Sequence, residues 1–254
     1  MAAQPRSLKY EYDCYVEAEI ENYKDSIPRS TILRIGDEAV CNIRESEQGG
    51  FGELLLCTEV DRIIRKRLRL PSYATWRRRR LKLIEAYRRP EHWGMSADAP
   101  LVRAVPAVAE AHVLVLGTQE EGTTLYLAAN GCQVTTVEDD PDMVDRVILT
   151  ASQCGLLGRV HGKVSSLDNW VPDVPLHAVV SSPAAFDRLS LDERHRVIEI
   201  LKSATLDGGV HLVRALAAGD AVLDLDELRQ RYQGWDVAIA EQGTSFLARK
   251  NIAA

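Results

Sequence analysis

From residue 112 onwards, short apolar and β-branched runs alternate with longer segments of helical periodicity. The strand-like runs are 112–117, 133–138, 159–164, 177–182, 208–216, 235–240 and 245–250. The helical segments between them are 123–130, 141–154, 190–204 and 224–233. Strands that alternate with helices predict an α/β fold, in which helices cover both faces of a mostly parallel sheet. Right-handed crossovers then place a ligand site at the carboxyl ends of the strands.

The first 90 residues have a different and mainly helical pattern. An acidic helix is expected over 8–25 and a second helix over 53–69, from the spacing of their apolar residues. A third helix is expected over 72–89, after a serine that suits the N-cap position. This part of the chain therefore predicts a helical cap in front of the sheet.

Two N-terminal segments are not expected to be helical. From Thr31 to Ile43, the run ILRIGDEAVCNI predicts a β-hairpin that turns at Gly36-Asp37. Residues 90–100 contain two prolines and a glycine, which is typical of a linker. We therefore expect two domains, which are the cap over 1–95 and the sheet domain over 98–254.

Residues 112–131, HVLVLGTQEEGTTLYLAANG, join the first expected strand to the first helix of the sheet domain. A strand that ends at Gly117 lets the backbone approach a ligand, and the free amides at the start of the helix favour an anion. About 20 residues further on, the second strand ends at Glu138, where a carboxylate can accept the two hydroxyls of a ribose. A plain strand-to-helix turn at Gly117 and an exposed strand-end acid at Glu138, beside Asp139 and Asp140, are the alternatives.

With Gly117 at the end of the first strand and Glu138 at the end of the second, the chain resembles the class I S-adenosylmethionine-dependent methyltransferases. Residues 178–216 resemble the family's fourth strand, the following helix and the fifth strand, and residues 234–251 resemble its closing pair of strands, the last of them usually antiparallel. The resemblance covers residues 98–254. It implies a doubly wound, seven-stranded Rossmann-like sheet, S-adenosylmethionine as the cofactor, and methyl transfer. The residues that it implies for the cofactor are Gly117, Thr118, Gln119, Glu138, Asp139 and Ser181.

On the substrate side, Asp187 and Arg188 occupy the place where small-molecule methyltransferases often carry Glu-His. An ion pair that flanks a helix is the alternative for these two residues. The segment SSPAAF, residues 181–186, lacks the Pro-Pro-aromatic pattern that base-amino methyltransferases usually show after the fourth strand. The resemblance therefore favours a small-molecule acceptor over a nucleic acid. No single catalytic residue is expected, because positioning and exclusion of water carry most of the catalysis in this geometry.

Several positions depart from the family pattern. The departures are Val115 in the first strand, Gln119 and Glu121 in the loop, Lys163 after Gly162, and His177 at the start of the fourth strand. For the third strand, a shift of register would bring Ser165 or Ser166 to the compared position. A side chain in place of a loop glycine occupies space that a ligand would need. These departures support a second hypothesis, a methyltransferase-derived binding or scaffold protein without cofactor or activity.

The charge of the chain is distributed unevenly. Residues 62–89 contain 12 Lys and Arg and one acid, Glu85, which gives this segment a net charge of +11. Because the whole chain carries −6, the remaining residues carry −17. The basic segment fits either phosphate contacts, as in a nucleic-acid methyltransferase, or ion pairs with surplus acids of the sheet domain. The acidic remainder favours the ion pairs.

One arginine of the basic segment stands apart from the others. In helical projection Arg80 shares an arc with the apolar residues Trp76, Leu83 and Tyr87. We therefore expect Arg80 to be buried against the sheet domain, where it would bind a carboxylate or an anionic substrate.

The five cysteines are an odd number, widely spaced and without a C-x-x-C pair. Neither a disulfide framework nor a metal site is therefore expected. No apolar run approaches the ~18 residues that a membrane span needs, and the N-terminus lacks the apolar core of a secretory signal. We expect a cytoplasmic protein that does not bind membranes, and a homo-oligomer is left open.

Overall fold

The computed structural model describes residues 7–45, 52–105, 109–117, 121–214, 216, 223–240 and 244–252. Contacts divide the chain into two compact units, one extending to Leu83 and the other beginning at Ile84. This division lies earlier than the boundary expected between residues 95 and 98, because Trp93 and Met95 pack into the core of the second unit.

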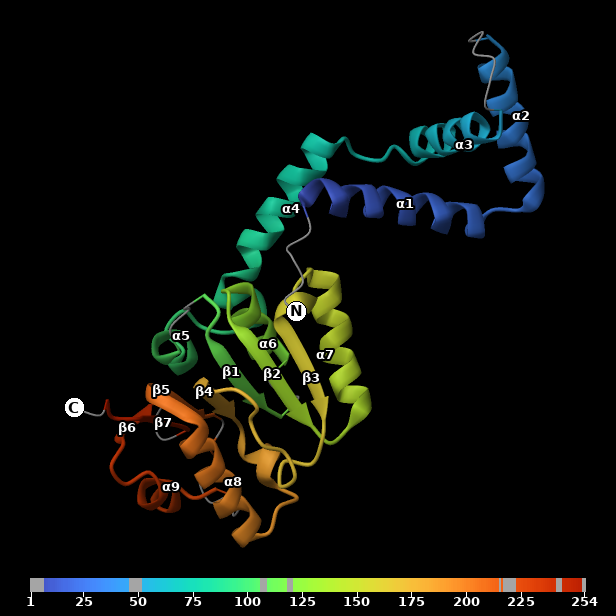
Figure 1. The fold of residues 1–254 in the computed structure, drawn as a ribbon. Coiled ribbons are helices and arrows are strands. Elements are labelled where there is room, and N and C mark those ends of the chain that lie inside the picture. Colours follow the sequence, from blue (N-terminus) through green and yellow to red (C-terminus); the bar gives the residue numbers. More distant parts are fainter. Residues whose placement is uncertain are drawn as a thin grey trace. The chain divides into compact units, whose positions relative to one another are not determined.

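The first unit is built from helices (Figure 1). They are α1 (Leu8–Ser26), α2 (Arg29–Glu45), α3 (Gly52–Leu68) and most of α4 (Tyr73–Tyr87). The helices predicted over 8–25, 53–69 and 72–89 are thus confirmed. A small apolar core joins α1, α2 and α3, and its buried residues are Ile20, Ile35, Ala39, Ile63 and Ile64.

The hairpin predicted over residues 31–43 is wrong, because this segment forms α2. Ile32, Ile35 and Ala39 recur at helical spacing, and Ile35 and Ala39 are completely buried against the neighbouring helices. Gly36 lies inside the helix, where a Cβ would meet no atom within 4 Å. Burial of this helical stripe therefore outweighs the β-branched residues and the Gly-Asp pair, which suggested a turn.

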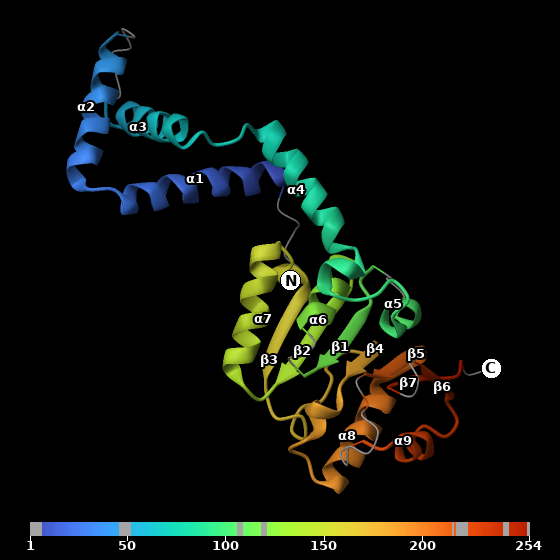
Figure 2. The same ribbon diagram turned by 180° about the vertical axis from the view of Figure 1, so that it is seen from behind.

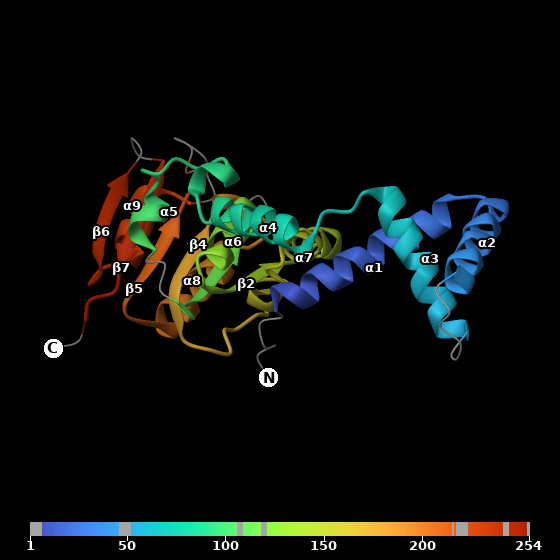
Figure 3. The ribbon, with the colours of Figure 1, turned by 90° about the horizontal axis from the view of Figure 1, so that it is seen from above.

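The second unit contains a seven-stranded sheet in the order β3-β2-β1-β4-β5-β7-β6 (Figures 1 and 2). The strands are β1 (His112–Leu116), β2 (Gln133–Glu138), β3 (Val160–Val164), β4 (Leu176–Ser181), β5 (Thr205–Val213), β6 (Asp236–Ala240) and β7 (Ser245–Arg249). The first five strands pair in parallel, whereas β7 pairs antiparallel to both β5 and β6. Figure 3 shows β6 and β7 at one end of the sheet. The predicted strands and the antiparallel closing pair are confirmed.

Helices cover both faces of this sheet, as the alternating pattern predicts. They are α5 (Pro100–Ala104), α6 (Glu121–Ala129), α7 (Pro141–Cys154), α8 (Leu191–Ala204) and α9 (Leu225–Arg231), with short 3-10 turns η1 (Pro90–Trp93), η3 (Leu157–Arg159) and η4 (Pro183–Phe186). Val113 and Val115 of β1 pack with α5, α6 and α7, and Leu114 and Leu116 pack with α8 and α9. Strands buried on both faces explain the continuous apolar runs in the sequence.

The described cysteines differ in exposure between the two units. Cys14, Cys41 and Cys57 of the first unit are exposed. Cys132 in the second unit is buried, and Cys154 is half-buried. Burial raises the pKa of the Cys132 thiol.

Candidate functional site

The carboxyl ends of β1, β2 and β4 meet in register in the middle of the sheet (Figure 2). Leu116 at the end of β1 pairs with Val137 of β2 on one side and with Ser181 of β4 on the other. The residues that come next along the three segments are Gly117, Glu138 and Ser182. The sheet changes winding direction between β1 and β4, and doubly wound sheets bind ligands at such a switch point.

Gly117 makes a turn at this edge that requires a glycine. Its φ is +91°, and a Cβ there would lie 3.3 Å from Ser182 Oγ and 3.6 Å from Ala185 Cβ. Both the left-handed backbone and the close neighbours disfavour any side chain at this position. The positive φ of Gly117 thus turns the chain out of β1 directly beside the buried Ser182.

Ser182 is a site residue that the sequence analysis missed. It is 4 % exposed, and its Oγ has no hydrogen-bond partner among the residues that the structure describes. A buried hydroxyl without a partner costs about 1–3 kcal/mol. The Ser182 hydroxyl therefore lies beside Gly117 with hydrogen-bonding capacity that a ligand can use.

Ser181 and Arg214 lie on the other side of this edge. Ser181 is buried, and its carbonyl oxygen accepts the backbone N–H of Arg214 at 2.8 Å. Arg214, directly after β5, extends toward α6 and donates from Nη1 to Thr123 Oγ1 at 2.6 Å. This places a guanidinium near the first turn of α6, and no sequence pattern singled Arg214 out.

Glu138 stands at the end of β2 as predicted and is half-buried. Its Oε1 accepts the N–H of Asp139 at 3.2 Å, and its carbonyl oxygen accepts the N–H of Ser165 at 2.9 Å. These bonds fix the backbone where the chain leaves the strand. The carboxylate is thus held at the strand edge, and its role toward a ribose stays a prediction.

The structure brings two of the predicted residues together across the sheet edge. Arg188, after η4, forms an ion pair with Asp139, after β2. Asp187 next to it is exposed, and the Arg188 side chain is 79 % exposed. An exposed pair of this kind adds little stability. It does connect the segment after β2 to the segment after β4.

Two predicted cofactor residues, Thr118 and Gln119, lie outside the described residues. Glu121, which departs from the family pattern, opens α6 and forms an ion pair with Arg146 of α7 at 3.2 Å. Much of the negative charge that Glu121 brings to the loop is therefore offset by Arg146.

Two nearby glycines serve packing instead of ligand approach. A Cβ at Gly122 would lie 3.1 Å from the carbonyl oxygen of Trp93, and a Cβ at Gly162 would lie 2.4 Å from Val144 Cγ1. Gly162 is thus a contact of β3 with α7, and the residues that follow β3 at the carboxyl edge are Ser165 and Ser166. Of the two alignments considered for the third strand, the shifted one, which compares Ser165 or Ser166 with the family's residues, therefore brings the compared residues to the carboxyl edge of the sheet.

The other departures are Lys163, which pairs with Val137 near the carboxyl end of β3, Val115, which lies one residue before the end of β1, and His177. Lys163 is exposed on the edge strand β3, and Val115 is completely buried in the core. His177 is exposed at the amino end of β4, where its Nδ1 accepts the N–H of His112 at 3.1 Å. His177 therefore serves as a surface strand residue at the opposite end of the sheet.

Arg80, a predicted substrate residue, lies in the first unit. Its Nε is 3.1 Å from Glu11 Oε2 of α1, and its side chain is 15 % exposed. Arg80 thus has a carboxylate partner, but this partner lies in the helical unit and not in the sheet domain, where we expected it. Binding of a substrate by Arg80 stays a prediction.

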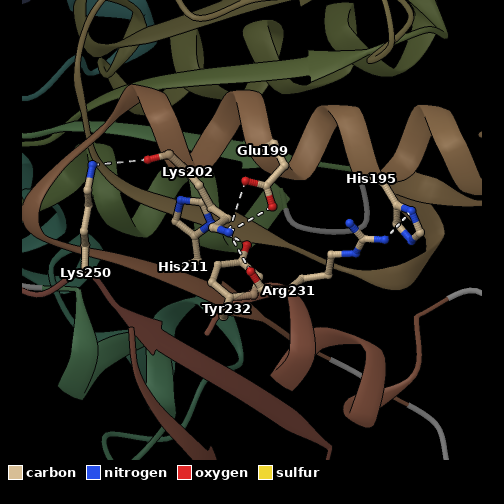
Figure 4. Close-up of polar contacts among 7 residues, drawn as sticks. All are labelled: His195, Glu199, Lys202, His211, Arg231, Tyr232 and Lys250. Atoms are coloured by element: carbon tan, nitrogen blue, oxygen red, sulfur yellow. Dashed lines mark hydrogen bonds and ion pairs between the residues drawn. The ribbon is translucent and has the colours of Figure 1, made fainter. Parts of the chain in front are cut away.

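A buried polar cluster lies between β5, α8 and α9, apart from the strand ends (Figure 4). The Thr205 hydroxyl donates to the carbonyl oxygen of Leu201 at 2.7 Å, so its oxygen must accept from His211 Nε2 at 2.7 Å. His211 Nδ1 then accepts the Tyr232 hydroxyl at 2.6 Å. Every polar group of this chain of bonds has a partner, so the cluster fixes β5 to α8 and α9.

The ionisation of this cluster is shifted by its surroundings. Burial, together with the nearby Lys202 and Lys250 ammonium groups, lowers the pKa of His211 to about 3. Burial and the charge of Glu199 raise the pKa of Tyr232 above its usual range. Lys202 Nζ binds Glu199 Oε1 at 2.9 Å and the Arg231 carbonyl oxygen at 2.5 Å (Figure 4). His211 is therefore neutral at physiological pH and serves as a structural residue.

Among the described residues, no group of three or more His, Cys, Asp and Glu is arranged to bind a metal ion. No helix in the part of the chain that the structure describes is long and apolar enough to cross a membrane.

No model of a protein family matches the sequence, and no curated protein matches it. Solved structures do match. TehB from Haemophilus influenzae is 20% identical, with a TM-score of 0.50 over 63% of this chain and 65% of that chain. The glycopeptide N-methyltransferase MtfA complexed with S-adenosylhomocysteine is 12% identical, with a TM-score of 0.48 over 60% of this chain and 86% of that chain.

The chain therefore spans about two thirds of the length of TehB, at 65%. Identity at this level concerns the fold alone. The likeness and the strand order β3-β2-β1-β4-β5-β7-β6 show that residues from β1 to β7 have the class I methyltransferase fold. The fold that the resemblance implied is confirmed.

Proposed function

We propose that this protein binds S-adenosylmethionine at the ends of β1, β2 and β4 and transfers its methyl group to a small-molecule acceptor. The observation that carries the proposal is the pairing of Gly117 with Ser182. A glycine with a φ of +91°, at which a side chain is strained, lies beside a buried hydroxyl without a partner among the described residues, at the switch point of the sheet.

The residues at the strand ends fit the cofactor chemically. Glu138 and Asp139 supply carboxylates for the hydroxyls of a ribose, and the Ser182 hydroxyl can donate to or accept from a polar group of the ligand. Arg214 supplies a cation near the start of α6, where the helix N-terminus also favours an anionic group. Ser181 fixes the backbone beside them.

When bound, the cofactor supplies a methyl group on a positively charged sulfur. The work of the protein is to hold the two reactants in line and to keep water out. Asp187 and Arg188 lie after η4, and Arg188 already contacts Asp139 of the cofactor set. We assign both residues to the acceptor side of the site. The Ser182–Phe186 segment presents Ala184 and Ala185 and no paired prolines before an aromatic, which supports a small acceptor.

Calorimetric titration with S-adenosylhomocysteine tests the proposal. Glu138→Gln keeps the shape of the side chain and removes its charge, so we expect binding to weaken by about 10- to 100-fold. The matched control is Asp236→Asn, which removes one carboxylate at the exposed start of β6 and should leave the affinity unchanged. Absence of heat with the wild type would support the scaffold hypothesis, and equal affinity of wild type and Glu138→Gln would refute the assigned site.

A further inference from the structure

The helix α4 carries four exposed cations within six residues. Arg77, Arg78, Arg79 and Lys82 are all exposed, whereas Trp76 and Arg80 turn toward α1. Trp76 stacks on Tyr15 with ring centroids 6.2 Å apart. By helical periodicity, Arg78 and Lys82 lie on the side opposite to Trp76 and Arg80, with Arg77 and Arg79 flanking them. We call these four exposed residues the basic face of α4.

Other cations of the basic segment have acidic partners in their own neighbourhood. Their ion pairs are Arg62–Glu59, Arg67–Glu38, Arg80–Glu11 and Arg88–Glu85. Among the described residues, these arginines therefore form ion pairs close to their own positions in the chain or within the helical unit, and not the expected ion pairs with surplus acids of the sheet domain. The first 61 residues alone carry 13 acidic and 6 basic side chains, which places much of the surplus acid in the helical unit itself.

The basic face of α4 differs from those paired cations. Arg77, Arg78 and Lys82 form no ion pair with any residue that the structure describes. The acidic residue of this helix, Glu85, forms an ion pair with Arg88, in which Arg88 Nη1 lies 3.9 Å from Glu85 Oε2. Like charges at positions i and i+4, as in Arg78 and Lys82, repel each other by a few tenths of a kcal/mol, about 0.2–0.5. A bound polyanion would offset this repulsion through its own attraction to both cations.

The surroundings of the basic face decide between kinds of polyanion. A helix that lies on an anionic membrane needs an apolar side that is free to enter the lipid. On α4 that side holds Trp76 and Tyr73, whose rings pack against Tyr12 of α1. A protein partner would need large anchors, most often Trp, Tyr or Arg in pockets, at the centre of its interface; the exposed apolar side chains of α4 are Leu81 and Leu83, 40 % and 39 % exposed, and its aromatic residues are buried or half-buried. A phosphate backbone needs no apolar anchor, because cationic side chains bind it through charge and charge-assisted hydrogen bonds.

We propose that the basic face of α4 binds the phosphate backbone of nucleic acid, without reading its sequence. Three of the four cations are arginines, whose planar guanidinium groups bind phosphate through two hydrogen bonds at once. The aromatic residues of this region are engaged within the unit, so they do not stack on bases. The binding therefore involves the backbone, and it stands apart from the proposed methyl transfer.

Fluorescence anisotropy of the full chain with labelled duplex RNA and duplex DNA tests this proposal. The variant Arg77→Gln/Arg78→Gln/Lys82→Gln should raise the Kd by at least about tenfold at ~100 mM salt. The slope of log K against log salt should fall by about one for each cation removed. The two duplexes show whether the site prefers RNA or DNA.

The matched control is Arg103→Gln/Arg196→Gln/Arg229→Gln, which removes the same charge from exposed arginines of the second unit. It should change the Kd less than threefold, or by about 0.6 kcal/mol. Both triple variants should keep the urea midpoint of the wild type and its heat of binding to S-adenosylhomocysteine, so that failure of this proposal is separate from failure of the proposed function.

Three outcomes would overturn the proposal. The first is no binding of either duplex even at ~50 mM salt. The second is an equal loss of affinity in the control variant, which would make binding a matter of overall charge. The third is binding to vesicles of phosphatidylglycerol, lost in the first triple variant, with none to the duplexes.

Discussion

The Tyr232 hydroxyl donates to His211 Nδ1 at 2.6 Å, which leaves the proton of the neutral imidazole on Nε2. Both residues are completely buried between β5 and α9. The ring has no room for a second proton, because each of its nitrogens already has a partner that fits the neutral form. The fold therefore depends on the neutral form of His211.

Acid should destabilise the protein through His211. Its pKa is about 3 in the folded state and about 6.5 in an unfolded chain, so the unfolded state binds the extra proton as the pH falls below 6.5. The stability is thus present above pH 6.5 and is lost progressively toward pH 3. From pH 7 to pH 5 the loss from this group is about 2 kcal/mol. Urea unfolding at the two pH values measures it.

The control for this prediction is His211→Gln, which should lower stability at pH 7 but remove about 2 kcal/mol of the pH dependence. Should that variant fail to fold, the ring proton resonances of His211 serve instead. They should not shift between pH 7 and pH 4.5. A titration of His211 near pH 6 would contradict the buried, neutral assignment.

Ser182→Ala should stabilise the protein and weaken its ligand binding at the same time. Removal of a buried hydroxyl without a partner among the described residues should raise the free energy of unfolding by about 1 kcal/mol. Loss of a hydrogen bond to the ligand should weaken S-adenosylhomocysteine binding by about fivefold. Thermal unfolding and calorimetry measure the two effects.

Ser203→Ala, at an exposed position on α8, is the control for ligand binding and should leave the affinity unchanged. A purely structural Ser182 would give a change in stability with no change in affinity. That result would remove Ser182 from the site.

Gly36→Ala should stabilise the first unit. Gly36 lies inside α2, and a Cβ there would meet open space, so alanine gains helix propensity without a clash. The expected gain is about 0.5–1 kcal/mol, measured by urea unfolding. A turn at Gly36-Asp37 would instead lose stability on this substitution, so the sign of the change distinguishes helix from hairpin.

Arg80→Gln should destabilise the first unit by about 1 kcal/mol, because it removes the charged partner of the half-buried Glu11 carboxylate. Arg78→Gln, on the opposite side of the same helix, should change stability by less than about 0.5 kcal/mol. Unfolding of the two variants side by side checks the prediction. Equal stability of both variants would mean that the Arg80–Glu11 pair contributes nothing to the fold.

The sheet domain was predictable because the apolar residues of each strand and helix recur in the pattern typical of that element. Strands buried on both faces appear as apolar runs such as HVLVL, and α7 and α8 appear as amphipathic segments between turn residues. The prediction of a hairpin for the segment of α2 was wrong because Ile32 and Ile35 suit either a strand or a helix. Only its neighbours α1 and α3, which bury Ile35, decide between the two.

The site was only partly predictable for a related reason. Gly117 and Glu138 are recognisable because they terminate strands in a known order. Ser182 matters through its burial and the absence of a partner among the described residues, and two adjacent serines in a sequence do not show which one is buried against a glycine. Arg214 matters through its bond to Thr123, 91 residues earlier in the chain.

The uneven exposure of the cysteines gives each unit its own chemical reporter. A maleimide reagent should modify Cys14, Cys41 and Cys57 rapidly, because these thiols are exposed to solvent and accessible to the reagent. Cys132 is completely buried, so it should react only in molecules whose sheet has opened. With the three N-terminal thiols and the half-buried Cys154 replaced by serine, the alkylation rate of Cys132 becomes a direct measure of how often the class I fold comes apart in native buffer.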